Sequence, residues 1–246
     1  MTRRTFEQVW DAVADVEGWM TSEQGQALYE AAQNCPHGGR IVEIGSFQGR
    51  STIVLASAAP DGATVYAIDP HAGNDRGPEE ISGYADAAAD DHALFLANLA
   101  RAGVSERVTH LRMFSDAALD EIDGPVDVLY VDGAHRYVPA RADIHDWGRR
   151  VAPGGAMLIH DSFSSVGVTL AILRELAAGR RFRYVGRSRS LTIYRADLHG
   201  GRVSNATRQL AQLPWFVKNL ALKVVLKLGL GRLLRRLGRE VPEWPY

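Results

Sequence analysis

Short apolar runs alternate with longer segments of helical periodicity through most of the chain. Five of these runs predict strands, at 40–45, 63–69, 108–113, 126–132 and 156–161. The segments between them carry the apolar spacing of helices, and regular alternation of this kind predicts a parallel sheet with helices on both faces. Two further runs, 182–185 and 191–194, are joined by a short polar turn and predict an antiparallel hairpin that closes the sheet.

The pattern predicts an α/β fold with a Rossmann-like, doubly wound sheet of seven strands, mostly parallel with a C-terminal antiparallel hairpin, and with helices added at both ends. We expect a helical cap over 1–38, a ligand-binding domain over 39–198 and a basic amphipathic helical tail over 199–246. The segment 71–84, rich in Gly, Asp and Pro, is long enough to predict a lid or acceptor-binding loop.

Composition and charge indicate which partners the protein is expected to have and in which cellular compartment it is expected. The chain has 246 residues and a formal net charge of −1, which gives no reason to expect nucleic acid as a partner. The single cysteine, Cys35, excludes an internal disulfide and fits a reducing, cytoplasmic location. Residues 1–15 lack the apolar core of a secretory signal, and the sequence has no apolar run long enough to predict a membrane span.

The tail differs from the rest of the chain in charge. From Arg202 onward there are nine Lys or Arg residues and two acids. Residues 214–228 are predicted to form a helix that is apolar on most faces, because its polar stripe is narrow. We expect this helix to cover the body or a second subunit of a homodimer, since wide apolar surfaces are normally buried in protein. A peripheral contact with a membrane surface is the alternative.

Glycines and acids follow the first two predicted strands. Gly45 permits a tight turn after the first strand, and Gly49 lets the next helix begin close to a ligand. Asp69 ends the second strand, where a carboxylate can accept both hydroxyls of a ribose. The spacing from Glu43 is Glu-x-Gly-x-x-x-Gly and not the GxGxxG of NAD-binding proteins. An acid at Glu43 suits a ligand with an ammonium and a sulfonium better than one with a pyrophosphate.

Later strand ends carry a second set of polar segments. The third strand is followed by Ser115 and Asp116, the fourth ends Asp132-Gly-Ala-His135, and the fifth ends His160-Asp161-Ser162. Across roughly 40–194 these segments together resemble the class I methyltransferases that use S-adenosylmethionine (SAM). Within that class they are similar to the metal-dependent O-methyltransferases of the catechol and caffeoyl-CoA type, and more so to actinobacterial enzymes that methylate macrolide sugars or methylmannose polysaccharides.

The resemblance implies a cofactor site and a metal site. It implies that SAM is bound by residues at the strand ends: Glu43, Gly45, Ser46, Gly49, Ser51, Asp69, Ser115, Asp116 and Asp132. Asp132 and Asp161 match positions that hold a divalent ion, and Ser162 stands where catechol-type enzymes have a third ligand, asparagine. Oxygen ligands suit Mg²⁺ best, with Mn²⁺ and Ca²⁺ as alternatives. Glu43, Gln48 or water are further candidates for the shell.

The chemistry of methyl transfer to a hydroxyl explains why an ion is expected. A sugar hydroxyl lies about six pKa units above histidine, so full proton transfer before the reaction would cost about 8 kcal/mol. A bound cation lowers the pKa of the hydroxyl. His135 is the expected general base, with His160 and His71 as competing candidates.

These residues predict a SAM-dependent O-methyltransferase, assisted by a divalent metal, that methylates a hydroxyl of a sugar or glycan. The acceptor is expected to be a small molecule or an oligosaccharide. Two alternatives stay open at this point: a metal-independent methyltransferase acting on a small molecule such as a phenol or carboxylate, and a nucleotide-binding Rossmann protein.

Overall fold

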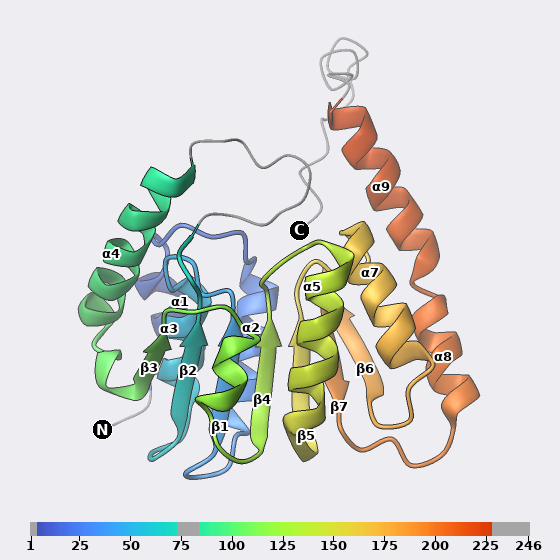
Figure 1. Cartoon of the computed structure of the whole chain (residues 1–246), viewed down its shortest axis with the longest axis horizontal. Helices are drawn as coiled ribbons and strands as arrows, with labels where there is room; N and C mark the ends of the chain where they lie inside the picture. The colour runs from blue at the N-terminus through green and yellow to red at the C-terminus, as the bar shows by residue number, and fades with distance from the viewer. Residues whose placement is uncertain (1–3, 73–83, 228–246) are drawn as a thin grey trace.

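Seven strands form one sheet in the order β3-β2-β1-β4-β5-β7-β6 (Figure 1). The structure is a computed structural model that describes residues 4–72 and 84–227. The first five strands run parallel, whereas β7 lies antiparallel to both β5 and β6. Their bounds are β1 (Arg40–Ile44), β2 (Thr64–Ile68), β3 (Val108–Leu111), β4 (Val126–Val131), β5 (Val151–Ile159), β6 (Arg183–Ser188) and β7 (Leu191–Arg195). Chain order reverses between β1 and β4, which is where doubly wound sheets bind ligands.

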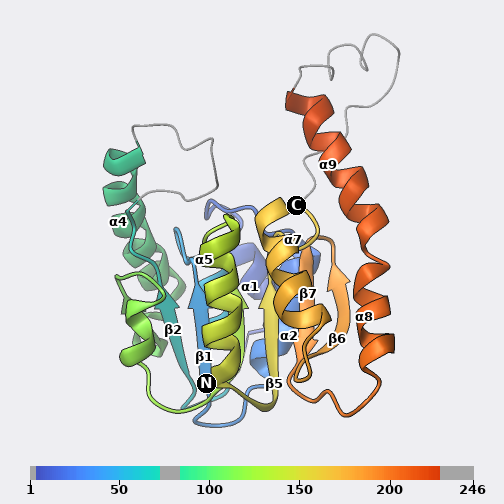
Figure 2. The same cartoon turned by 45° about the vertical axis from the view of Figure 1, so that its right-hand side comes forward.

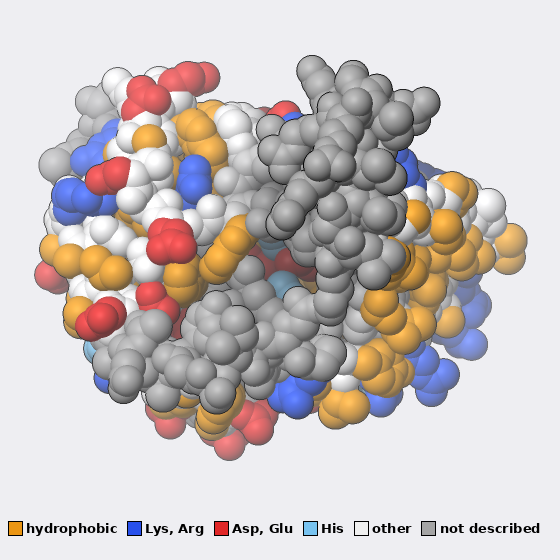
Figure 3. Space-filling view, turned by 90° about the horizontal axis from the view of Figure 1, so that it is seen from above, with side chains coloured by type: hydrophobic (Ala, Val, Ile, Leu, Met, Phe, Trp, Pro, Cys, Tyr) orange, Lys and Arg blue, Asp and Glu red, His pale blue; other side chains and the backbone are white. Residues whose placement is uncertain are grey.

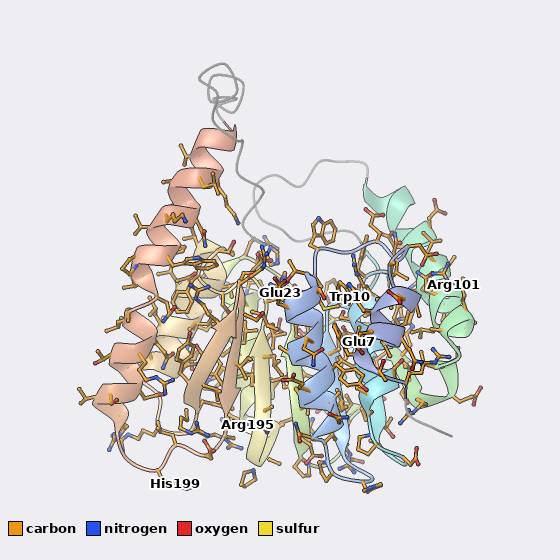
Figure 4. All side chains as sticks on the ribbon, turned by 180° about the vertical axis from the view of Figure 1, so that it is seen from behind. Glu7, Trp10, Glu23, Arg101, Arg195 and His199 are labelled. Carbon is orange, nitrogen blue, oxygen red and sulfur yellow. The ribbon has the colours of Figure 1, made fainter. Side chains whose placement is uncertain are left out.

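Helices cover both faces of the sheet and define two apolar cores. One core packs against α1 (Phe6–Ala12), α2 (Ser22–Gln33), α3 (Arg50–Ala58) and α4 (Tyr84–Ala102). Figure 4 shows α1 and α2 on this face, with Trp10 and Glu23 labelled. The other core packs against α5 (Tyr137–Ala142), η3 (Asp143–Trp147), α6 (Gly148–Arg150), α7 (Val166–Ile172), η4 (Leu173–Ala177) and the start of α9 (Leu213–Lys227). Side chains of β1 alternate between the two cores, with Ile41 in the first and Val42 in the second.

The last two helices form an arm beside the β6–β7 hairpin. Helix α8 (Arg202–Leu210) lies against β6, and α9 continues past the carboxyl ends of the strands (Figure 2). Among residues 4–72 and 84–227, no helix is long and apolar enough to cross a membrane.

The predicted α/β fold, with its mostly parallel sheet and antiparallel C-terminal hairpin, is confirmed. Three local features differ from the prediction or lie outside the described residues, and the first two have physical causes. Helix α8 lies within the helical tail expected over 199–246, but its bounds were not predicted, because its buried residues are the polar Asn205 and Gln209 and give no apolar periodicity. Strand β5 begins at Val151, ahead of the expected start, since it pairs with β4 through an irregular register. Helix α4 begins at Tyr84, and residues 73–83 of the expected lid loop lie outside the described residues.

Candidate active site

The turn after β1 brings the backbone of two strands unusually close. Gly45 has φ +86°, and a Cβ there would lie 2.3 Å from the carbonyl oxygen of Asp132. The Gly45 amide donates to the Ile68 carbonyl at 2.8 Å, and the Asp132 amide donates to the Ile44 carbonyl at 2.8 Å. Gly45 is therefore held between β2 and β4, and only the absence of a side chain allows this approach.

The same turn carries a buried hydroxyl and a second left-handed glycine at the carboxyl end of β1. Gly49 has φ +89° and stands at the start of α3. The hydroxyl of Ser46 is buried and has no hydrogen-bond partner among the described residues. An unpaired buried hydroxyl beside a glycine turn fits a polar ligand at this edge, since buried polar atoms are normally paired.

Glu43 lies fully buried one residue before the end of β1. The hydroxyls of Ser51 and Thr52 both donate to its carboxyl oxygens. Burial raises the pKa of Glu43 to about 8, against the lowering effect of these two hydrogen bonds, and the nearby Asp132 and Asp69 raise it further. Ser51, predicted to bind the cofactor, is thus placed to hold Glu43.

The raised pKa of Glu43 predicts a pH-dependent stability difference. The group titrates at 4.5 normally and at about 8 in the folded chain, so its contribution to stability is complete below pH 4.5 and is lost as the pH rises through 8. The Glu43→Gln variant does not titrate, so we expect its stability to improve relative to wild type by a few kcal/mol between about pH 5 and about pH 9. Urea unfolding of both proteins measures this change. A stability difference between the two proteins that stays constant with pH would contradict the raised pKa of Glu43.

Asp69 lies at the end of β2, and backbone amides hold its carboxylate. Its Oδ2 accepts from the Phe47 amide at 2.9 Å, and its Oδ1 accepts from the His71 amide at 2.8 Å. Phe47 and His71 both have left-handed backbones, with φ of 45° in each case. The carboxylate is thus fixed on the turn after β1, with lone pairs left to accept further hydrogen bonds.

After β3, Ser115 is bonded into the body of the protein, whereas Asp116 lies at the surface. Ser115 donates through its hydroxyl to Asp143, and its carbonyl accepts from the Trp147 indole at 3.1 Å. Burial raises the pKa of Asp143 to about 7, and Asp116 and Asp146 add to this effect. Asp116 is exposed and accepts from the Ala117 amide at 2.8 Å, which leaves its second oxygen at the surface.

Asp132, His135 and Asp161 converge at the carboxyl ends of β4 and β5. One ligand atom from each lies within 4.8 Å of the others. The His135 Nε2 lies 3.0 Å from the Asp161 Oδ2. Viewed from the carboxyl ends of the strands, acidic and histidine side chains lie deep between the surrounding segments (Figure 3). Asp161 has a left-handed backbone with φ 52°, which is strained for a residue other than glycine and is typical of functional positions.

Two further side chains complete the charge balance of this cluster. The His160 Nδ1 lies 3.1 Å from the Asp132 Oδ1 and 3.2 Å from the Asp161 Oδ2. Burial alone would lower the pKa of His160, but the two carboxylates outweigh it and raise the pKa to about 10. Tyr130 is fully buried and donates its hydroxyl to the Asp132 Oδ2 at 2.7 Å. Burial and Asp132 keep the pKa of Tyr130 well above its usual value, so it remains a donor.

Three other residues that were candidates for the metal site or the base make contacts outside the Asp132–His135–Asp161 cluster. The hydroxyl of Ser162 donates to the Ile159 carbonyl at 2.8 Å and lies 2.7 Å from the Thr192 hydroxyl, so a role in metal binding stays a prediction. The Gln48 amide donates to Asp91 at 2.8 Å. His71 contacts the rings of His92, Phe95 and His110. No motif marks Asp143, which lies on η3 and contacts Ser115 only in the folded chain.

A comparison with protein families matches the part of the chain that contains this site. Residues 42–162, which contain every member of the Asp132–His135–Asp161 cluster, match the family described as a methyltransferase domain. Residues 42–162 are therefore similar to a methyltransferase domain, and β6 and β7 lie beyond the matched range. Together with the sheet order, the match supports a SAM-dependent methyltransferase of class I.

Solved O-methyltransferases share the fold of this methyltransferase domain. An O-methyltransferase from Bacillus cereus, determined with S-adenosylhomocysteine (SAH), is 20% identical with a TM-score of 0.54, and the match covers 79% of this chain and 90% of that one. TomG from Streptomyces achromogenes, an O-methyltransferase involved in tomaymycin synthesis and determined with SAM, is 17% identical with a TM-score of 0.51, covering 80% of this chain and 92% of that one. At these identities the likeness establishes the fold alone.

One curated relative is closer in sequence but much longer. The uncharacterized protein y4gI of Sinorhizobium fredii is 34% identical over 130 residues. The match covers 50% of this chain but 13% of that protein, so the chain spans a small part of this relative's length.

Proposed function

We propose that this chain is an O-methyltransferase that transfers the methyl group of SAM to a hydroxyl of a sugar or glycan, assisted by a divalent ion. The observation that carries the proposal is the convergence of Asp132, His135 and Asp161 at the ligand-binding edge of a methyltransferase domain. The choice of a sugar rests on the likeness of the Asp132–His135 and His160–Ser162 segments to sugar O-methyltransferases.

The residues present fit a SAM molecule. The glycine turn at Gly45, the unpaired hydroxyl of Ser46 and the backbone-anchored carboxylate of Asp69 lie on neighbouring strand ends. Asp69 would accept the ribose hydroxyls, because its two oxygens are already oriented by backbone amides. SAM supplies the methyl group and the leaving group, so the protein has to position and deprotonate the acceptor.

The residues also fit a divalent cation. The two carboxylates of Asp132 and Asp161 offer hard oxygen donors that suit Mg²⁺ or Mn²⁺, and the His135 imidazole lies within 4.8 Å of them. Asp132 and Asp161 would hold the ion, and when bound it would lower the pKa of the acceptor hydroxyl. The Tyr130 hydroxyl would orient Asp132 both with and without the bound ion.

His135 is placed to accept the acceptor's proton. When Nε2–H donates to the Asp161 Oδ2, the lone pair of the neutral ring lies on Nδ1, and Nδ1 is the atom that takes the proton. Asp161 then stabilises the imidazolium that forms, as a carboxylate does for a catalytic histidine in hydrolases.

A metal-independent methyltransferase is the second candidate, and His160 favours it. His160 contacts both Asp132 and Asp161, so when protonated it neutralises part of their negative charge without an ion. In this alternative the Asp161–His135 pair acts alone on an acceptor whose pKa is lower than that of a sugar hydroxyl.

Metal binding separates the two candidates. We expect Mn²⁺ to bind the wild-type chain at one site, measured by electron paramagnetic resonance, and EDTA to abolish methyl transfer. Asp161→Asn should weaken Mn²⁺ binding by about 100-fold or more, because it removes a direct metal ligand. Mutations of residues that only hydrogen-bond to metal ligands already weaken metal binding by about 10–100-fold. Asp146→Asn makes the same chemical change at an exposed site and should bind Mn²⁺ like wild type. Full turnover in EDTA would favour the metal-independent enzyme.

A further inference from the structure

Helix α9 has one face anchored to the body and one face exposed. On the inner face, the Asn219 amide donates to the Phe163 carbonyl at 3.1 Å and Lys223 donates to the Ser164 carbonyl at 3.0 Å. These bonds fix α9 to the loop that follows Asp161. Near the start of the helix, Arg187 stacks on the Trp215 ring at 3.9 Å.

The outer face of α9 consists of Val217, Leu220, Ala221 and Val224, which are all exposed. Val217, Leu220 and Val224 keep 62%, 40% and 50% of their surface in solvent. Their spacing of three and four positions places them on one side of the helix. Three large apolar side chains in one stripe form a surface suited to a partner with an apolar interior.

The outer face stands clear of the described body. Helix α9 flanks the sheet and projects beyond the carboxyl ends of the strands (Figures 1 and 2). From above, hydrophobic side chains cover the side of the molecule where α9 lies (Figure 3).

The positive charge of residues 198–239 favours an anionic lipid surface over a second copy of the chain as the partner of α9. Residues 198–239 contain nine Lys or Arg residues and no Asp or Glu. Lys218 is exposed next to the apolar stripe. Two copies of the chain that met through the outer face would bring cations together, whereas an anionic lipid surface offers opposite charge and an apolar interior.

We propose that the outer face of α9 docks on an anionic lipid surface, with the helix lying in the interface and the exposed Lys218 contacting lipid headgroups. A helix of this kind inserts its apolar stripe at the boundary of headgroups and acyl chains while basic residues bind anionic lipid.

Vesicle sedimentation of the full chain tests the proposal. We expect binding to vesicles of phosphatidylcholine mixed with phosphatidylglycerol to exceed binding to pure phosphatidylcholine by about tenfold or more, and to fall in high salt. Leu220→Asp should weaken binding to the mixed vesicles by about tenfold or more, because it places a negative charge in the apolar stripe. Val203→Asp makes a similar change on α8, where Val203 is 81% exposed, and should bind like wild type.

Three results would overturn the proposal. These are equal binding to both kinds of vesicle, unchanged binding by Leu220→Asp, and a lipid-free dimer by light scattering that Leu220→Asp converts to monomers while wild type ignores vesicles. The last result would assign the outer face of α9 to a second copy of the chain. Thermal melting of both variants, and their SAH affinity, verify that the body is intact.

Discussion

Replacing Gly45 by alanine is expected to abolish tight cofactor binding and to destabilise the domain. The added Cβ would lie 2.3 Å from the Asp132 carbonyl oxygen and 2.7 Å from its carbonyl carbon. These are backbone atoms, and the hydrogen bonds from Gly45 to Ile68 and from Asp132 to Ile44 prevent either strand from moving aside alone. Left-handed strain and overpacking together should lower the free energy of unfolding by roughly 2–5 kcal/mol. SAH affinity, measured by calorimetry, should fall by about 100-fold or more, because the turn that carries the Ser46 hydroxyl and the Phe47 amide bonded to Asp69 would be displaced.

Gly103→Ala is the matched control for backbone strain. Gly103 has φ +70°, and no heavy atom would lie within 4 Å of its added Cβ. This variant should lose about 1–2 kcal/mol of stability from the left-handed backbone alone, and its SAH affinity should stay at the wild-type value. Equal losses in both variants would mean that the close approach of Gly45 to Asp132 has no special role.

Replacing His135 by alanine is expected to remove most methyl transfer without weakening cofactor binding. The base that takes the acceptor's proton is lost, and general base catalysis contributes about 10²–10⁴-fold to a rate. We therefore expect kcat to fall by about 10²–10⁴-fold while SAH affinity changes by less than about twofold. The measurement is transfer of radiolabelled methyl from SAM to a sugar acceptor found by screening.

The control for His135 is His145→Ala, which removes an imidazole that contacts Glu175 at 2.9 Å and is 44% exposed. It should keep wild-type kcat. If His135→Ala raised KM alone, His135 would position the acceptor and another group would take the proton. If the same variant also lost Mn²⁺ binding, His135 would be a metal ligand, which its place beside Asp132 and Asp161 allows.

Much of the fold follows from the sequence because burial sets its pattern. The run 128–131 carries no charged residue, since this part of β4 lies in the middle of a sheet covered on both sides. The parallel sheet then brings Asp69, Asp132 and Asp161 to one edge, because each ends a strand. Pattern and topology together therefore predict which acids can share a site.

The remaining features depend on contacts that no local pattern records. Helix α8 buries Asn205, whose amide pairs with backbone atoms of Phe182 and Tyr184, so a polar face is satisfied by tertiary contacts. The pairing of Ser115 with Asp143 joins two segments 28 positions apart. Ser162 follows Asp161 directly, but the left-handed turn at Asp161 leaves the serine hydroxyl on Ile159 and Thr192. Side-chain direction in such a turn cannot be derived from sequence spacing.

The most direct test of the account is calorimetric titration of the wild-type chain with SAH, in Mg²⁺ and again in EDTA. We expect one SAH to bind per chain with a micromolar dissociation constant, and NADH should give no binding. Absence of SAH binding in both buffers, together with tight binding of NADH, would contradict the SAM site and assign the sheet edge to a nucleotide.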